Sequence, residues 1–188
     1  MKKLLKTTLF FYLLSISLLS YSEKSEKLNI ETSHGNIIIE IYPEKAPITV
    51  KNFLNYVDNG FYNGTIFHRI IEGFMIQGGG FEKDMTEKET DAPIKNEADN
   101  GLKNIPYTIA MARTSVPDSA TSQFFINIAN NSFLDYPGQD GAGYCVFGKV
   151  TDGIGAIIKI GKLATTTRGG MSDVPIKRVT IKSITKLN

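Results

Sequence analysis

Short apolar segments separated by turn residues make up most of the chain after residue 22, and only two longer segments have helical periodicity. A helix should begin at Pro47 and end before Asn59, because Val50, Phe53, Leu54 and Val57 form one apolar stripe. A second helix is expected over residues 153–160. Strands are expected at about eight other segments, namely residues 28–32, 36–42, 65–71, 74–78, 107–112, 124–128, 144–150 and 178–185.

The order of these segments restricts the fold. The two helical segments follow the second strand and precede the last one, so they do not alternate with strands as in a βαβ protein. A sheet of many short strands leaves unpaired edges unless it closes on itself. The sequence therefore predicts a mainly β fold, a closed antiparallel β-barrel of about eight strands capped by two α-helices.

The N-terminal segment differs in composition from the rest. Lys2, Lys3 and Lys6 precede sixteen uncharged residues, 7–22, with an apolar centre over residues 9–19. This pattern predicts a signal peptide over residues 1–22, a mature domain over residues 23–188, and export to the periplasm or the medium. The alternative is a retained membrane anchor, but a membrane span needs about 20 apolar residues.

Composition excludes several classes of function. The formal net charge of +2 is too small to favour nucleic-acid binding. One cysteine, Cys145, and two histidines provide neither an intramolecular disulfide nor a cluster with metal-ligand spacing. We therefore expect no metal, no cofactor and no nucleic-acid partner, and after signal cleavage a monomer that does not associate with membranes.

An arginine lies inside the apolar segment from Phe67 to Ile71. A period of two residues places Phe67, Arg69 and Ile71 on one face of a strand. Such an arginine either faces solvent or acts electrostatically on a ligand. Phe74, Met75 and Gln77 follow closely, which indicates a small apolar pocket with one cation and one amide.

Three segments in order, residues 67–80, 122–127 and 146–150, together resemble the cyclophilin family of peptidyl-prolyl cis-trans isomerases. The resemblance extends from about Leu28 to the C-terminus, and residues 110–114 and 119–121 are similar to the bacterial branch. It implies an eight-stranded barrel with two helices, and it implies that proline-containing peptides and unfolded protein clients are the partners.

The resemblance also implies roles for individual residues. Arg69 and Gln77 are assigned to catalysis, and Gln123 resembles a second polar residue beside the pocket. The Arg113 backbone N–H is expected to bind the carbonyl that precedes proline, in a stretch that includes Ala112. The walls of the proline pocket are assigned to Phe74, Met75, Phe125 and Leu134.

Two positions depart from the best-known members of the family. Phe133 stands where tryptophan is usual and Tyr144 where histidine is usual in eukaryotic cyclophilins, and both are expected to contact substrate. Phe133 cannot donate the indole hydrogen bond, so tight cyclosporin binding is not expected. The sequence leaves two alternatives open: a non-catalytic binder of proline peptides, and a barrel that carries a small ligand in an open lumen.

Overall fold

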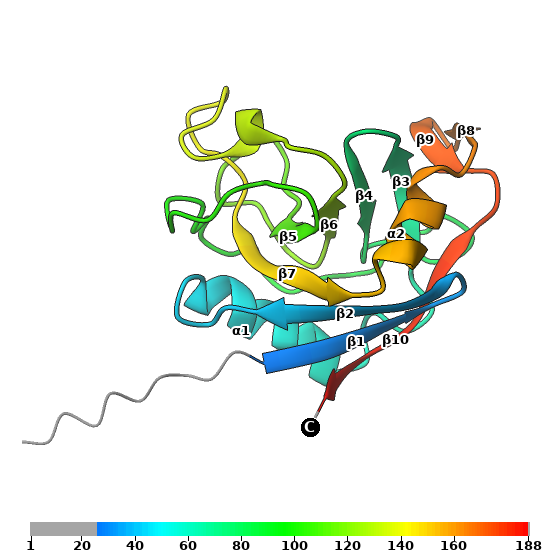
Figure 1. The fold of residues 1–188 in the computed structure, drawn as a ribbon, viewed down its shortest axis with the longest axis horizontal. Coiled ribbons are helices and arrows are strands. Elements are labelled where there is room, and N and C mark those ends of the chain that lie inside the picture. Colours follow the sequence, from blue (N-terminus) through cyan, green and yellow to red (C-terminus); the bar gives the residue numbers. More distant parts are fainter. Residues whose placement is uncertain (1–25, 188) are drawn as a thin grey trace, which may run out of the picture.

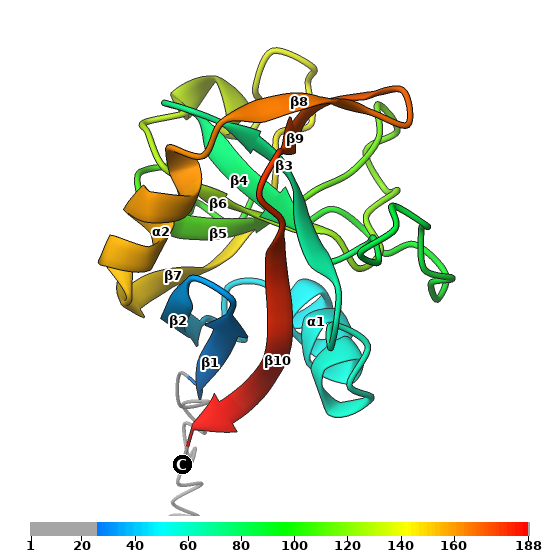
Figure 2. The same ribbon diagram turned by 90° about the vertical axis from the view of Figure 1, so that its right-hand side faces the viewer.

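The computed structural model describes residues 26–187, and eight of the strands in this range close into an antiparallel barrel. The order of the strands around the barrel is β1-β10-β3-β4-β6-β5-β7-β2 (Figures 1 and 2). This architecture confirms the predicted fold. The barrel strands are β1 (Glu26–Thr32), β2 (Gly35–Ile41), β3 (Ile66–Ile71), β4 (Met75–Gly78), β5 (Thr108–Met111), β6 (Phe124–Asn127), β7 (Val146–Asp152) and β10 (Val179–Leu187).

The two expected helices are α1 (Pro47–Asp58) and α2 (Ile154–Gly161), which lie on opposite sides of the barrel (Figure 2). Helix α1 begins at Pro47, whose fixed φ suits the first helical turn. Its buried face includes Val50, Phe53 and Val57, three members of the predicted stripe, while Leu54 is only partly buried. Helix α2 packs on the barrel through Ile157 and Ile160.

Aromatic rings fill the barrel. The Phe53 ring from α1 lies 5.1 Å from the ring centroid of Phe147 and 5.3 Å from that of Tyr62. Phe124 packs edge-on against the rings of Phe53 and Phe67. All five rings are at most 1 % exposed, so the interior is a packed core. The alternative of an open lumen for a carried ligand therefore does not fit this barrel.

A β-bulge in β3 overturns one expectation about the arginine strand. The pairing of β3 with β4 shifts between Phe67 and Arg69, so His68 is the additional residue. Phe67 consequently shares the main core with Ile70, whereas Ile71 packs on a second, separate apolar cluster. The prediction that Phe67, Arg69 and Ile71 lie on one face was wrong for Phe67, because a bulge interrupts the two-residue alternation.

The structure adds a hairpin that the sequence pattern did not indicate. Strands β8 (Thr165–Arg168) and β9 (Met171–Pro175) form a separate two-stranded sheet. This hairpin lies beside β3 in both views (Figures 1 and 2). Strand β8 is almost fully exposed and therefore has no alternation of apolar and polar residues to reveal it. A short 3-10 helix, η1 (Ser132–Leu134), was also not anticipated.

The expected signal peptide, residues 1–22, lies outside the described residues. Within residues 26–187, neither helix is long and apolar enough to cross a membrane.

Candidate active site

A pocket of about 180 Å³ lies on the outer surface of the barrel, over strands β3, β4 and β6. It contains all the site residues expected from the sequence except Gln123 and Phe133. The residues that line it are Arg69, Phe74, Met75, Gln77, Ala112, Arg113, Phe125, Leu134 and Tyr144. Residues 69–77 and 112–144 thus meet at one place, although they are distant in the sequence.

The floor of the pocket is a small apolar cluster, separate from the barrel core. Met75 and Phe125 are buried in it at 2 % and 4 % exposure, and Phe74 and Leu134 pack against it from the edge. The cluster exists because alternate residues of β4 and β6 point away from the barrel interior, where Ile76 and Ile126 are found instead. A ring or side chain that enters the pocket therefore meets an apolar surface that is already assembled.

Arg69 contributes the positive charge at the edge of this pocket. It is paired with Gln77 across β3 and β4, so both side chains belong to neighbouring positions of the same sheet. The guanidinium is 43 % exposed, and its Nε lies 3.5 Å from Asp173 Oδ2 on β9. Within residues 26–187 this carboxylate is the one charged or hydrogen-bonding partner found for the Arg69 side chain. The terminal Nη groups remain available to a ligand.

The amides of Gln77 and Gln123 are joined to each other. Gln77 Nε2 donates to Gln123 Oε1 over 3.0 Å, and Gln123 Nε2 donates to Glu87 Oε1 over 3.3 Å. Gln123 therefore stands behind Gln77, outside the pocket lining, and fixes the orientation of the Gln77 amide. This oriented amide leaves its own Oε1 as an acceptor that faces away from Gln123.

The Arg113 side chain is an internal support, and only the Arg113 backbone is free for a ligand. The side chain is 2 % exposed, and its Nε and Nη2 donate to Gly143 O over 3.0 and 2.8 Å. Nη2 also pairs with Asp140, and hydrogen bonds from this guanidinium lower the pKa of Asp140 to about 2. The Arg113 backbone N–H donates to no acceptor within the described part of the chain.

Aromatic side chains form the rim. Phe133 is 45 % exposed and stacks on Phe74, with ring centroids 5.6 Å apart. Tyr144 packs edge-on against Phe125, with centroids 5.8 Å apart. Tyr144 precedes β7, which begins at Val146, so the expected strand start at residue 144 was two residues too early. This difference frees Tyr144 from the barrel ladder and allows its ring to line the pocket.

Sequence reasoning missed a buried network of amides beneath the pocket. Asn131 Nδ2 donates to Phe74 O over 2.9 Å and to Asn127 Oδ1 over 2.6 Å. Asn127 Nδ2 in turn donates to Asn104 Oδ1 and Thr108 Oγ1. These three asparagines are at most 2 % exposed, so their hydrogen bonds fix the backbone that carries Phe74. The sequence analysis assigned these side chains no role, because asparagines are typical of surface turns.

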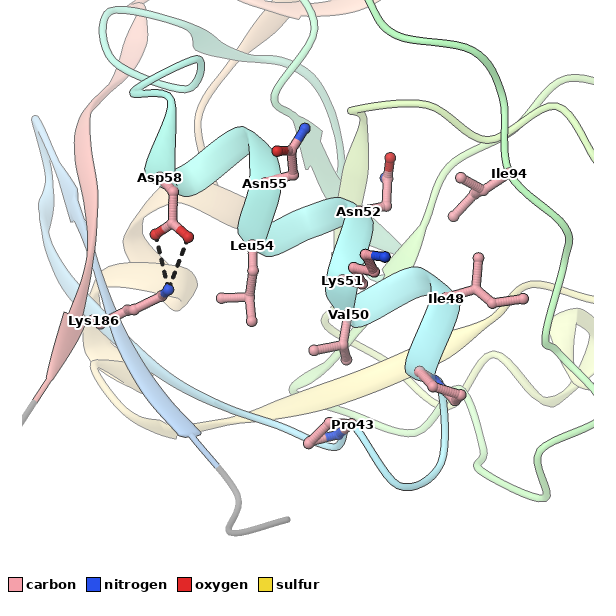
Figure 3. A pocket seen from close by; sticks show the side chains of 11 residues that line it. Pro43, Ile48, Val50, Lys51, Asn52, Leu54, Asn55, Asp58, Ile94 and Lys186 are labelled. Carbon is pink, nitrogen blue, oxygen red and sulfur yellow. Dashed lines mark hydrogen bonds and ion pairs between the residues drawn. The ribbon is translucent and has the colours of Figure 1, made fainter.

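A larger surface groove, of about 960 Å³, runs along the outer side of α1 (Figure 3). Ile48, Leu54 and Ile94 line it, and Lys186 pairs with Asp58 at one end. None of the site residues expected from the sequence lies in this groove. The convergence of a cation, an oriented amide and a free backbone donor distinguishes the smaller pocket.

No group of three or more histidine, cysteine, aspartate or glutamate residues that could hold a metal occurs within residues 26–187.

Comparison with known proteins identifies the family. The model of the cyclophilin type peptidyl-prolyl cis-trans isomerase family matches residues 27–186. Peptidyl-prolyl cis-trans isomerase B of Escherichia coli is 56 % identical over 160 residues, which cover 84 % of this chain and 98 % of the relative. A peptidyl-prolyl cis-trans isomerase of Acinetobacter baylyi is 59 % identical over 157 residues, 84 % of this chain and 83 % of its own.

Solved structures lead to the same family. A cyclophilin type peptidyl-prolyl cis-trans isomerase of Cryptosporidium parvum superposes with a TM-score of 0.76 at 28 % identity, covering 88 % of this chain and 99 % of that one. The same protein, crystallised in the presence of the dipeptide Ala-Pro, superposes with a TM-score of 0.74. By fold and by the identity of its relatives, this chain belongs to the cyclophilin-type family of peptidyl-prolyl cis-trans isomerases.

Proposed function

We propose that the pocket of Arg69 catalyses rotation about X-Pro bonds by binding the twisted amide more tightly than either planar form. The observation that carries this proposal is the meeting of the Arg69 guanidinium with a preformed apolar floor and a free backbone N–H. The proline ring rests on Met75 and Phe125, and the Arg113 N–H holds the carbonyl that precedes proline. A neutral peptide with one ring and one carbonyl fits these groups.

The chemistry needs no nucleophile. Amide resonance opposes rotation by about 18–20 kcal/mol, and X-Pro bonds isomerise in tens to hundreds of seconds without a catalyst. Rotation localises the lone pair on the proline nitrogen, which becomes a hydrogen-bond acceptor in the twisted state only. An Arg69 N–H directed at this nitrogen therefore stabilises the transition state selectively. No covalent bond forms or breaks.

Arg69 cannot supply the whole rate enhancement. A millionfold acceleration corresponds to about 8 kcal/mol, whereas one charge-assisted hydrogen bond contributes about 1.5–3 kcal/mol. The remainder is assigned to preorganisation: the proline ring held by the pocket walls, the carbonyl held by the Arg113 N–H, and Gln77 fixed by Gln123. Each of these groups is already in place without the substrate, so little reorganisation accompanies the reaction.

We further propose that the clients are exported proteins that fold outside the cytoplasm. The support is the N-terminal sequence, with Lys2, Lys3 and Lys6 before an apolar stretch that ends near Ser22. Removal of residues 1–22 would leave the described barrel, which begins at Glu26, complete. Localisation by fractionation of the producing cells, with N-terminal sequencing of the product, tests this part.

A protease-coupled assay on a proline tetrapeptide tests the catalytic proposal. The protein should accelerate isomerisation, and Arg69→Ala should lose most of the activity while it still binds the peptide, as followed by NMR titration. A non-catalytic binder of proline peptides would bind equally well in both forms and accelerate nothing. That second result would indicate a non-catalytic binder of proline peptides, the alternative that the sequence also allows, and would contradict the catalytic proposal.

A further inference from the structure

The hairpin β8–β9, which is not part of the barrel, brings one carboxylate to the pocket arginine. We propose that Asp173 is a positioning residue for the isomerase reaction, which orients the Arg69 guanidinium through its Nε. This inference rests on the proposed function of Arg69. Asp173 itself lies outside the pocket lining, so it acts through Arg69 and not by contact with substrate.

The ion pair uses the edge of the guanidinium that the substrate does not need. Asp173 Oδ2 lies 3.5 Å from Nε, and no partner of either Nη group of Arg69 is found within residues 26–187. An arginine has four rotatable side-chain bonds before its planar group, and ordering such a side chain has an entropic cost. A partner that restricts the side chain before substrate binds reduces the entropy that is lost when the substrate binds.

The backbone on each side of the pair has an irregular conformation that directs these two side chains. In β3 the bulge at His68 immediately precedes Arg69. The pairing of β8 with β9 shifts between Thr166 and Arg168 of β8. At this point two residues of β9, Ser172 and Asp173, lie opposite one residue of β8. Bulges redirect side chains and are frequent next to active sites. One bulge therefore directly precedes Arg69, and a second bulge, in β9, includes Asp173, its partner in the ion pair.

Asp173 also has a φ of +63°, in the left-handed region that residues other than glycine seldom occupy. The next residues, Val174 and Pro175, are buried, and Ile176 N donates to Ala164 O over 2.9 Å. These contacts hold the chain that directly follows Asp173, so Asp173 cannot relax to an extended conformation without disturbing them. Backbone strain that the surrounding structure maintains is found at functional sites.

Three variants separate the carboxylate from the backbone that carries it. Asp173→Asn keeps the shape and the tolerance for positive φ, Asp173→Gly removes the side chain from a backbone that glycine adopts freely, and Asp173→Glu keeps the charge. Because both side chains are partly exposed, the effect is modest: Asn and Gly should lower kcat by about twofold to fivefold. KM and peptide affinity should stay within about 1.5-fold, and Glu should retain more than half of the activity. The matched control is Glu31→Gln, which breaks the exposed pair of Glu31 with Lys182 at 2.9 Å and should change nothing.

A double-mutant cycle with Arg69→Ala distinguishes positioning from a general structural effect. Residual rates are measured by NMR exchange at high protein concentration. Asp173→Asn should have no further effect once Arg69 is absent, because its action passes through the guanidinium. An equal loss of activity in both backgrounds would overturn the proposal, as would unchanged kcat in folded Asp173→Asn and Asp173→Gly.

A readout without turnover keeps this inference separate from the proposed function. The Arg69 Nε–H should exchange faster with solvent, and its ¹⁵N relaxation should report greater motion, in Asp173→Asn than in the unmodified protein. An Nε–H whose exchange and relaxation do not respond to Asp173→Asn would overturn the pairing, whatever the activity. Full activity of Arg69→Ala would instead refute the proposed function of Arg69, and would do so without any Asp173 variant.

Discussion

The Arg113 guanidinium lies over the face of the Tyr144 ring, with its Cζ 4.2 Å from the ring centroid. Arg113 also donates to Gly143 O and Thr114 O and pairs with Asp140, so each of its three guanidinium nitrogens has an acceptor. The arrangement joins the segment that follows β5 to the segment that precedes β7. One side chain thus holds two walls of the pocket together, while the Arg113 backbone N–H has no acceptor within residues 26–187.

Replacement of Arg113 should therefore be costly for stability. Arg113→Met removes two donors to the Gly143 carbonyl, which keeps only Asn96 Nδ2 at 3.1 Å among the described residues, and it removes the contact of the cation with the Tyr144 ring. We expect the free energy of unfolding to fall by about 2–4 kcal/mol, measured by urea denaturation. Lys182→Met, which removes an exposed cation, should cost less than about 0.5 kcal/mol. Equal losses in the two variants would contradict a supporting role for Arg113.

Arg69→Ala should lower kcat/KM by tenfold to a thousandfold, which corresponds to about 1.4–4 kcal/mol of transition-state stabilisation. Arg69→Lys should recover part of this loss, because a lysine supplies charge without the planar fork of donors. The side chain is 43 % exposed, so neither change should disturb folding, and circular dichroism provides the check. Near-normal activity in both variants would rule out the mechanism.

His68 should make stability depend on pH. Burial, with the nearby Arg69 charge, lowers the pKa of His68 to about 4, and its Nδ1 has no hydrogen-bond partner within residues 26–187. The unfolded chain, with a histidine pKa near 6.5, then binds more protons than the folded one between about pH 6.5 and 4. Stability from neutral His68 is thus present above about pH 6.5 and is lost as the pH falls to about 4, by on the order of 3 kcal/mol.

The variant His68→Phe tests this dependence, since the ring already packs against Phe81 at 4.5 Å and Phe lacks the titrating group. Urea denaturation from pH 7 to 4 should show a shallower decline in the variant. His34, whose pKa is also lowered by burial, is common to both proteins and cancels in the difference. The same decline in both proteins would mean that His68 is not the titrating group.

Removal of residues 1–22 should give a folded and fully active protein. The pocket residues begin at Arg69, and the first barrel strand begins at Glu26. Activity and thermal stability of the shortened chain are the measurements, with N-terminal sequencing of the exported product as the check on processing near Ser22. An exported product that begins at Met1 in the membrane fraction would instead indicate an anchor.

Cyclosporin should bind weakly, because Phe133 stacks on Phe74 but offers no N–H to the inhibitor. An unpaired buried acceptor costs about 1–3 kcal/mol, or about fivefold to a hundredfold in affinity. Phe133→Trp should recover much of this affinity, and the 45 % exposure of Phe133 leaves room for the larger ring. Isomerase activity should change little. Nanomolar inhibition of the unmodified protein would contradict the role assigned to Phe133.

The sequence by itself determined the barrel and most of the pocket. Its helices were found from the apolar stripe of α1 and from the apolar run of α2, and its barrel strands from short apolar segments separated by turn residues. The pocket residues were assigned because they occur in three motifs with the order and spacing of one family. A motif preserves local backbone geometry, so Met75 and Gln77 could be placed on one strand without coordinates, whereas Phe74 lies in the turn before β4.

Only the tertiary structure decided what surrounds Arg69 and Arg113. The bulge that turns Phe67 into the core depends on pairing with β4, and the hairpin that carries Asp173 has an exposed strand with no hydrophobic period. Asp140 and Asp173 are 27 and 104 residues from their arginines, and nothing in the sequence indicates that an acid meets a base at such a distance. Contacts of this kind follow from how the chain closes in three dimensions, whereas periodicity records only which face of each segment is buried.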